Sequence, residues 1–231
     1  MNKRLQQLGI GLVLMGIVFF AAGGYTLYKT QQGSSALHAF SAAQNVTLTY
    51  NADGQLADAK GSTEEATAIM GLLTNDWGFT VDKSELNPND PVVNTPSEYM
   101  YQLATITYHT LHAATTVTIP ADVVVDGKVV TAAGTYDFQN TGKYWTGFDR
   151  TDPIQAAARG QIWTPTALAL VGQLGVGSVT GSALTMGLGI AALFALVGLT
   201  VVMTGLGLVW ATRASTEKVK APAFKQVANP A

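Results

Sequence analysis

The chain has 231 residues, of which 48% are apolar and only 12% are charged, and it contains no cysteine. Ordinary soluble domains are about one quarter charged, so the composition argues against a cytosolic enzyme. Without cysteine, this chain can form no disulfide, no thiolate-held zinc or iron–sulfur site and no cysteine nucleophile. We therefore expect a membrane protein with one domain and flanking anchors.

Two long stretches without charged side chains predict membrane-spanning helices near the two ends of the chain. The first, residues 8–28, lies between Arg4 and Lys29, and the second, residues 183–212, belongs to a charge-free stretch that begins at residue 160. About twenty apolar residues cross a hydrocarbon core of roughly 30 Å. A cleaved secretory signal is the alternative for the first stretch, but its apolar run is longer than most signal cores.

The charges outside these stretches predict how the chain crosses the membrane. Residues 1–7 and 213–231 together carry six basic side chains and one acidic one, whereas the part between the spans carries seven basic and fourteen acidic ones. Basic flanks stay in the cytoplasm, so we expect both termini inside and the central part outside the plasma membrane. The basic flanks also predict contacts with anionic lipid headgroups, and they are too short to bind along a nucleic acid.

The central part, residues 29–163, predicts one extracytoplasmic α+β domain with a small antiparallel sheet. The capping patterns Ser62-x-x-Glu65 and Thr95-x-x-Glu98 predict helices that end near residues 73 and 112. The other expected elements, in chain order, are a helix at 35–44 continuing the first anchor, a strand at 46–50, a loop at 75–95, a strand at 115–120, a hairpin at 123–130 with a type I′ turn at Asp126-Gly127, a strand at 134–138 and a helix at 153–163.

Residues 164–182 form a separate apolar segment in this prediction. Polar residues such as Gln173 and Thr180 interrupt it, and it is too short to cross before the second span begins. We expect a helix at the outer membrane interface. Because a monomer rarely exposes so much apolar surface, either lipid or a partner protein should cover it, and the sequence leaves both open.

Candidate chemistry in the central domain is limited to two histidines. His109 and His112 are three residues apart on a predicted helix, so both could face one metal ion. The third histidine, His38, lies in another predicted element, and hydrogen-bonded surface histidines are the simpler interpretation. No catalytic triad, paired-carboxylate motif or cofactor motif is present in the sequence, so we expect neither an enzyme nor a bound cofactor.

Small residues mark packing faces on both predicted spans. They recur every four residues on the second span and every seven on the first, as Ala183, Gly187, Ala191 and Ala195 and as Gly9, Gly16 and Gly23. Close van der Waals contact drives helix association in lipid, so these faces predict a helix-packing interface. The two spans could pack against each other, against helices of a partner, or against both. Neither span carries a charge, which argues against ion transport.

The anchor–domain–anchor plan resembles that of small actinobacterial two-helix membrane proteins. The stretches QNVTLTYNADG, PSEYMYQLATITYHTLHAATTVTI and QLGVGSVTGSALTMGLGI also resemble accessory subunits of the actinobacterial cytochrome bcc–aa3 respiratory supercomplex. Such a subunit, by implication, holds no redox centre, flanks the catalytic core in the membrane and presents its domain on the outer side.

These observations lead to two hypotheses about function. The first is a non-catalytic accessory subunit of a larger membrane complex, with integral membrane proteins as partners. The alternative is a free-standing envelope protein that binds a ligand or a metal through its outer domain. Neither the partner complex nor the ligand follows from the residues themselves.

Overall fold

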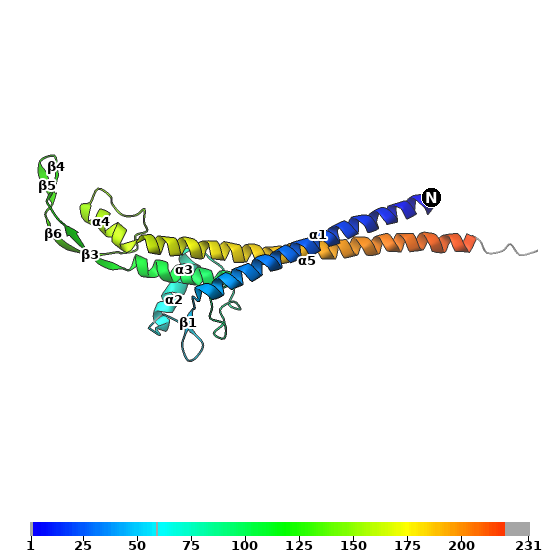
Figure 1. Ribbon diagram of the computed structural model, residues 1–231, viewed down its shortest axis with the longest axis horizontal. Helices are drawn as coiled ribbons and strands as arrows, with labels where there is room; N and C mark the ends of the chain where they lie inside the picture. The colour runs from blue at the N-terminus through cyan, green and yellow to red at the C-terminus, as the bar shows by residue number, and fades with distance from the viewer. Residues whose placement is uncertain (1, 59, 220–231) are drawn as a thin grey trace, which may run out of the picture. The chain divides into compact units, whose positions relative to one another are not determined.

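The computed structural model describes residues 2–58 and 60–219 of the chain (Figure 1). The predicted cytoplasmic tail at 213–231 therefore lies mostly outside the described residues. The chain divides into two compact units. We call the first, Met1–Ser34 with Ala183–Ala231, the helix-pair unit, and the second, Ser35–Ser182, the central domain.

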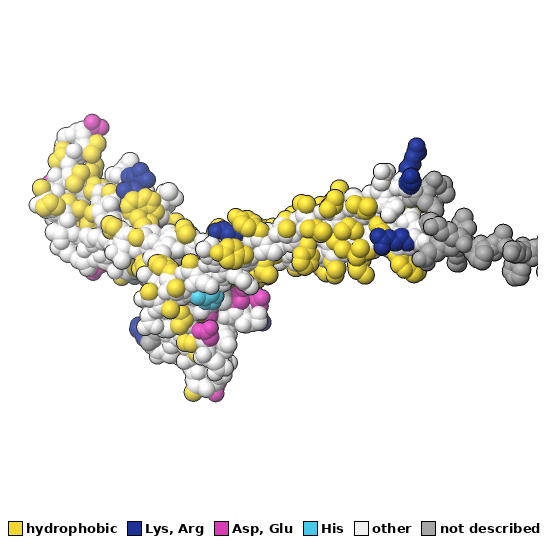
Figure 2. Space-filling view, turned by 45° about the vertical axis from the view of Figure 1, so that its right-hand side comes forward, with side chains coloured by type: hydrophobic (Ala, Val, Ile, Leu, Met, Phe, Trp, Pro, Cys, Tyr) yellow, Lys and Arg dark blue, Asp and Glu magenta, His cyan; other side chains and the backbone are white. Residues whose placement is uncertain are grey.

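Two helices that are long and apolar enough to span a membrane flank a small domain with small antiparallel sheets. Helix α1 (Asn2–Gln44) has 43 residues and helix α5 (Pro165–Val219) has 55. Figure 2 shows hydrophobic side chains covering the long helical part of the molecule. At about 1.5 Å per residue, α5 measures roughly 80 Å, which is more than twice the thickness of a hydrocarbon core.

Helix α1 contains both the predicted span at 8–28 and the predicted continuation at 35–44, and α5 runs without a break through residues 165–182 and the predicted span at 183–212. The boundary between the two compact units nevertheless falls between Ser182 and Ala183, and the location of residues 164–182 at a membrane interface stays a prediction. Proline breaks helices only in their interior, and Pro165 is the first residue of α5. Thr164 precedes it, and its Oγ1 accepts a hydrogen bond from the amide of Ala167 at 3.1 Å, as an N-cap does.

The central domain contains three short helices, one π-helical segment and six short strands. They are β1 (Thr49–Tyr50), β2 (Leu56–Ala57), α2 (Thr63–Gly71), the π-helix η1 (Leu72–Asp76), α3 (Pro96–Leu111), β3 (Ala114–Ile119), β4 (Val123–Val125), β5 (Lys128–Thr131), β6 (Gly134–Gln139) and α4 (Pro153–Ile162). The helices match the predicted ones to within a few residues. The predicted single sheet is instead three antiparallel pairs, β1–β2, β3–β6 and β4–β5.

The strands between residues 114 and 139 form one long two-stranded ribbon with an irregular middle. Ile119 pairs with Gly134, and Val123 pairs with Thr131 further along. Pro120 lies at the break, where its missing N–H ends the ladder. At the tip, Asp126 and Gly127 have φ angles of 52° and 76°, which confirms the predicted type I′ turn.

Two hydrophobic clusters form the core of the central domain. The first gathers around α2 and α3 and includes Leu174 of α5, and the second lies between the β3–β6 pair and α4. The side chains of Trp77 and Tyr108 pack against both clusters. Because Leu174 belongs to the predicted interfacial segment, one face of this segment is covered by the domain itself. A Cβ added to Gly177 would lie 2.6 Å from the ring of Tyr99, so glycine is what permits this close packing of α5.

The N-terminus of α3 is fixed by the predicted capping box. Thr95 Oγ1 accepts from the amide of Glu98, and Glu98 Oε2 accepts from the amide and hydroxyl of Thr95 and from the amide of Asn94 at 2.8–3.0 Å. The Glu98 side chain is only 1% exposed. Burial raises the pKa of this carboxyl group above its ordinary value, although these hydrogen bonds lower it in part.

This buried carboxyl group makes stability depend on pH in a defined direction. Because its pKa is higher in the folded chain than the ordinary value of about 4.3, the stability it contributes at lower pH is lost as pH rises through the raised pKa. Glu98→Gln keeps an acceptor oxygen and removes the ionisation. We therefore expect the stability of Glu98→Gln relative to the parent to increase between pH 4 and pH 7 in detergent unfolding experiments. The same substitution at exposed Glu64 is the control, and a difference that stays flat with pH would contradict the assignment.

Candidate functional site

Within the helix-pair unit, α1 and α5 meet directly through their backbones. A Cβ added to Gly16 would lie 2.7 Å from the carbonyl oxygen of Gly198, and one added to Gly9 would lie 2.8 Å from that of Gly205. Distances this short leave no room for a side chain. Since residue numbers rise along α1 as they fall along α5, the helices are antiparallel. The seven-residue spacing of the contacts is typical of a left-handed supercoil.

The observed contact face of α5 does not follow the four-residue spacing of the predicted small-residue face. Gly187 lies beside Thr30, and Ala191 and the half-buried Ala195 lie beside Gly23, but Ala183 is exposed. Steps of four residues turn about 40° around a helix, so such a stripe leaves a straight contact seam after a few turns. The seam instead follows Ala191, Gly198 and Gly205. Helix α1 of the same chain occupies this face.

The two candidate metal ligands, His109 and His112, turn to different partners. His109 Nδ1 lies 3.2 Å from Glu65 Oε1 on α2. The capping box predicted at Ser62 and Glu65 is only half formed, since Ser62 accepts from the amide of Glu65. His112 Nδ1 lies 2.8 Å from the carbonyl oxygen of Tyr108. Since a carbonyl oxygen can only accept, this nitrogen donates. Among residues 2–58 and 60–219, no three histidine, aspartate or glutamate side chains gather into a metal site.

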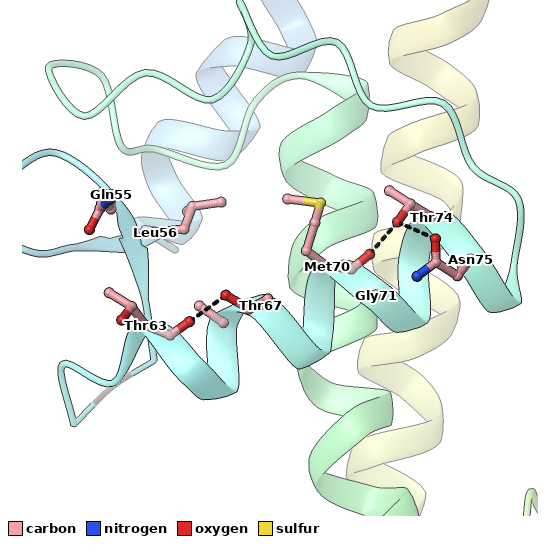
Figure 3. Close-up of a pocket in the computed structure, with 9 residues that line it drawn as sticks. Gln55, Leu56, Thr63, Thr67, Met70, Gly71, Thr74 and Asn75 are labelled. Atoms are coloured by element: carbon pink, nitrogen blue, oxygen red, sulfur yellow. Dashed lines mark hydrogen bonds between the residues drawn. The ribbon is translucent and has the colours of Figure 1, made fainter.

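One pocket of the central domain lies along α2 and is lined by uncharged residues (Figure 3). Its volume is about 530 Å³, and Thr63, Thr67, Met70 and Thr74 contribute to its wall. The hydroxyl of Thr67 donates to the carbonyl of Thr63 at 2.7 Å, and that of Thr74 donates to the carbonyl of Met70 at 2.8 Å. These two hydroxyl donors are used within the helix, and the amide side chains of Gln55 and Asn75 are further polar groups in the lining.

A second pocket, of about 730 Å³, has an aromatic wall. It lies between the α2–η1 segment, the end of α3 and the loop after β6, and its lining includes Asp76, Trp77, Tyr108, His112 and Tyr144. Trp77 Nε1 donates to the hydroxyl of Tyr144 at 2.9 Å. The rings of Tyr108 and His112 lie 4.3 Å apart. We call this the aromatic pocket.

The loop that carries Tyr144 is held by a buried asparagine. The side chain of Asn140 is 1% exposed; its Nδ2 donates to the carbonyls of Thr110 and Lys143 at 2.9 and 3.0 Å, and its Oδ1 accepts from the amide of Lys143 at 2.9 Å. The amide of Gly142 also donates to the carbonyl of Leu111 at 3.0 Å. These bonds tie the loop to the end of α3, so the wall of the aromatic pocket is ordered before any ligand binds.

Sequence reasoning missed the aromatic pocket. It singled out neither Trp77 nor Tyr144, and it considered His112 as a metal ligand or a hydrogen-bonded surface histidine. The structure shows a loop at residues 142–150. Trp77 and Tyr144 are 67 residues apart in the chain, and no local pattern links them.

Apolar side chains also remain exposed on two elements of the central domain. On α5, Val176 and Val179 are 67% and 71% exposed. On the β4–β5 hairpin, four valines are each more than half exposed, namely Val124, Val125, Val129 and Val130. Exposed apolar groups of this kind are typical of protein or lipid contact sites.

Comparison with known proteins found no matching family model, no matching curated protein and no matching solved structure. The fold and the sites described above therefore carry the functional argument by themselves.

Alanine at a seam glycine should destabilise the helix pair. In Gly16→Ala, the new methyl group meets the backbone of α5, whereas Gly24→Ala, on the same helix, places a methyl group where nothing lies within 4 Å. Overpacking costs about 1–3 kcal/mol. We expect a lower thermal unfolding temperature in detergent for Gly16→Ala and for Gly198→Ala, and no loss for Gly24→Ala or Gly207→Ala. Equal effects at seam and control positions would contradict the close approach.

Removal of the Asn140 amide should loosen the aromatic pocket. Asn140→Ala removes one hydrogen bond to the carbonyl of Thr110 and leaves the amide of Lys143 without its partner, at a cost of about 1–3 kcal/mol. We expect a lower unfolding temperature and a changed near-ultraviolet circular dichroism signal from the tryptophan and tyrosine rings. Asn89→Ala, at an exposed asparagine, is the control. An unchanged signal and temperature for Asn140→Ala would show that the loop is held by other contacts.

Proposed function

We propose that this chain is a non-catalytic accessory subunit of a larger membrane protein complex. The observation that carries the proposal is the apolar, charge-free helix face at residues 165–182 of α5, with Val176 and Val179 exposed.

The contacts within the helix-pair unit define which parts of the two helices lie at the same level. Thr30 lies beside Gly187, and Gly9 lies beside Gly205. The charge-free part of α1, between Arg4 and Lys29, therefore pairs with α5 from about Gly187 onward. Its 24 residues match the roughly 20 that a bilayer needs.

Exposed aromatic residues support this placement of the bilayer. Tyr25 and Tyr28 lie near one end of the paired stretch and Trp210 near the other, and all three side chains are largely exposed. Tyrosine and tryptophan concentrate where a membrane meets water.

The proposed placement favours protein over lipid as the cover of residues 165–182. These residues precede the stretch of α5 that pairs with the charge-free part of α1, so we propose that they lie outside the hydrocarbon core. This placement favours a protein over lipid tails as the cover of Val176 and Val179. An exposed apolar helix face outside the bilayer is typical of a protein interaction site, and a partner subunit is the cover that we propose.

The same proposal includes the orientation in the plasma membrane. Positive flanks and an acidic centre support cytoplasmic termini, contacts with anionic headgroups at the inner side and an extracytoplasmic central domain. The sequence resemblance makes the cytochrome bcc–aa3 supercomplex the first complex to examine.

Charge on the exposed face of α5 should weaken association with the partner. We expect Val176→Glu combined with Val179→Glu to reduce co-purification with a large assembly in mild detergent at least fivefold, while membrane insertion and the unfolding temperature stay close to those of the parent. Val176→Leu combined with Val179→Leu keeps the face apolar and should retain association.

Two results would contradict the proposal. The first is a parent protein that migrates only as a 24.2 kDa species or as its homodimer. The second is equal recovery of the complex with the glutamate and leucine variants, which would remove this face from the interface.

A further inference from the structure

The aromatic pocket combines ring surfaces with one carboxylate. Trp77, Tyr108 and Tyr144 supply the rings, Leu72 and Leu111 supply apolar wall, and Asp76 supplies the only charged side chain in its lining. The Asp76 side chain is exposed, and its carboxylate makes no hydrogen bond or ion pair with the part of the chain that the structure describes. Its negative charge is therefore available to a ligand.

The charge of the surrounding domain favours a positive ligand. The central domain carries fourteen acidic and six basic side chains, a net charge of −8. No lysine or arginine lines the aromatic pocket. A field of this sign raises the local concentration of cations and lowers that of anions.

A π-helix places the carboxylate beside the tryptophan. The segment η1 covers Leu72–Asp76, and Trp77 follows it directly as its C-cap. Single-turn π-helical segments inside or after α-helices are frequent at functional sites. Here the segment delivers Leu72, Asp76 and Trp77 to one wall, while Tyr108 arrives from α3 and Tyr144 from the loop that Asn140 holds.

We propose that the aromatic pocket binds a small organic cation, namely an amine or quaternary ammonium group. Aromatic rings attract such cations through their negative faces, most strongly in the case of tryptophan. The carboxylate of Asp76 adds direct charge attraction, and the apolar wall accepts the alkyl groups around the nitrogen. The ammonium group can belong to a free metabolite or to a lipid headgroup, since both present the same chemistry. This binding site is independent of the proposed role as an accessory subunit.

The test uses the full-length chain and a pair of probes that differ only in charge. Choline carries a quaternary nitrogen, and 3,3-dimethylbutan-1-ol has the same shape with carbon in its place. We expect titration calorimetry in nanodiscs of phosphatidylglycerol to show choline binding at least tenfold tighter than the alcohol. Repeating the titration in nanodiscs of phosphatidylcholine separates the two sources: weaker apparent choline binding there indicates that headgroups reach the pocket, and unchanged binding indicates a free ligand.

Variants connect binding to the pocket. Asp76→Asn removes the charge at an exposed position and should weaken choline binding about five- to tenfold without changing the unfolding temperature. Trp77→Phe keeps a ring and should weaken it less than Trp77→Leu. Asp53→Asn, at an exposed carboxylate outside the pocket, should leave binding unchanged. Equal affinity for choline and the alcohol, no measurable binding of choline, or equal effects of Asp76→Asn and Asp53→Asn would each overturn the proposal.

Discussion

Direct contact between helix backbones is the interaction on which α1 and α5 depend. Two apolar helices gain nothing from hydrophobic burial when lipid surrounds them, so their association rests on close van der Waals packing. Gly16 and Gly198 approach so closely that a single added methyl group would meet the opposite backbone. Helix α5 uses the same device in the central domain, where Gly177 admits the ring of Tyr99 and Gly181 the ring of Pro96. One helix thus serves two packing partners through its glycines.

The central domain gains its order from hydrogen bonds rather than from an extended sheet. Its strands pair only two by two, and isolated pairs are marginally stable. Buried polar side chains compensate at two positions. Glu98 fixes the start of α3, and Asn140 ties the following loop to the end of the same helix. The aromatic pocket lies beside this second tie, which holds the loop that carries Tyr144.

The structure distinguishes three apolar surfaces that the composition alone cannot tell apart. The glycine seam is buried within the chain. The apolar side chains opposite it, such as Leu14 and Val18, are exposed along the stretch of α1 that is free of charge. The third kind lies in the central domain, on the valines of α5 and of the β4–β5 hairpin. The second kind can face lipid, and the third is the surface on which the proposed interaction with a partner rests.

The sequence by itself determined the two apolar helices, the helices of the central domain, the capping box at Thr95 and the turn at Asp126-Gly127. Each depends on composition or on residues a few positions apart, so local chemistry is enough. Only the tertiary structure decided that α1 covers the small-residue face of α5, that Ala183 lies outside the seam and that His109 and His112 diverge. It also created the aromatic pocket, whose Trp77 and Tyr144 are 67 residues apart. Contacts between residues so far apart in the chain depend on how whole elements pack, and no periodicity of the sequence predicts them.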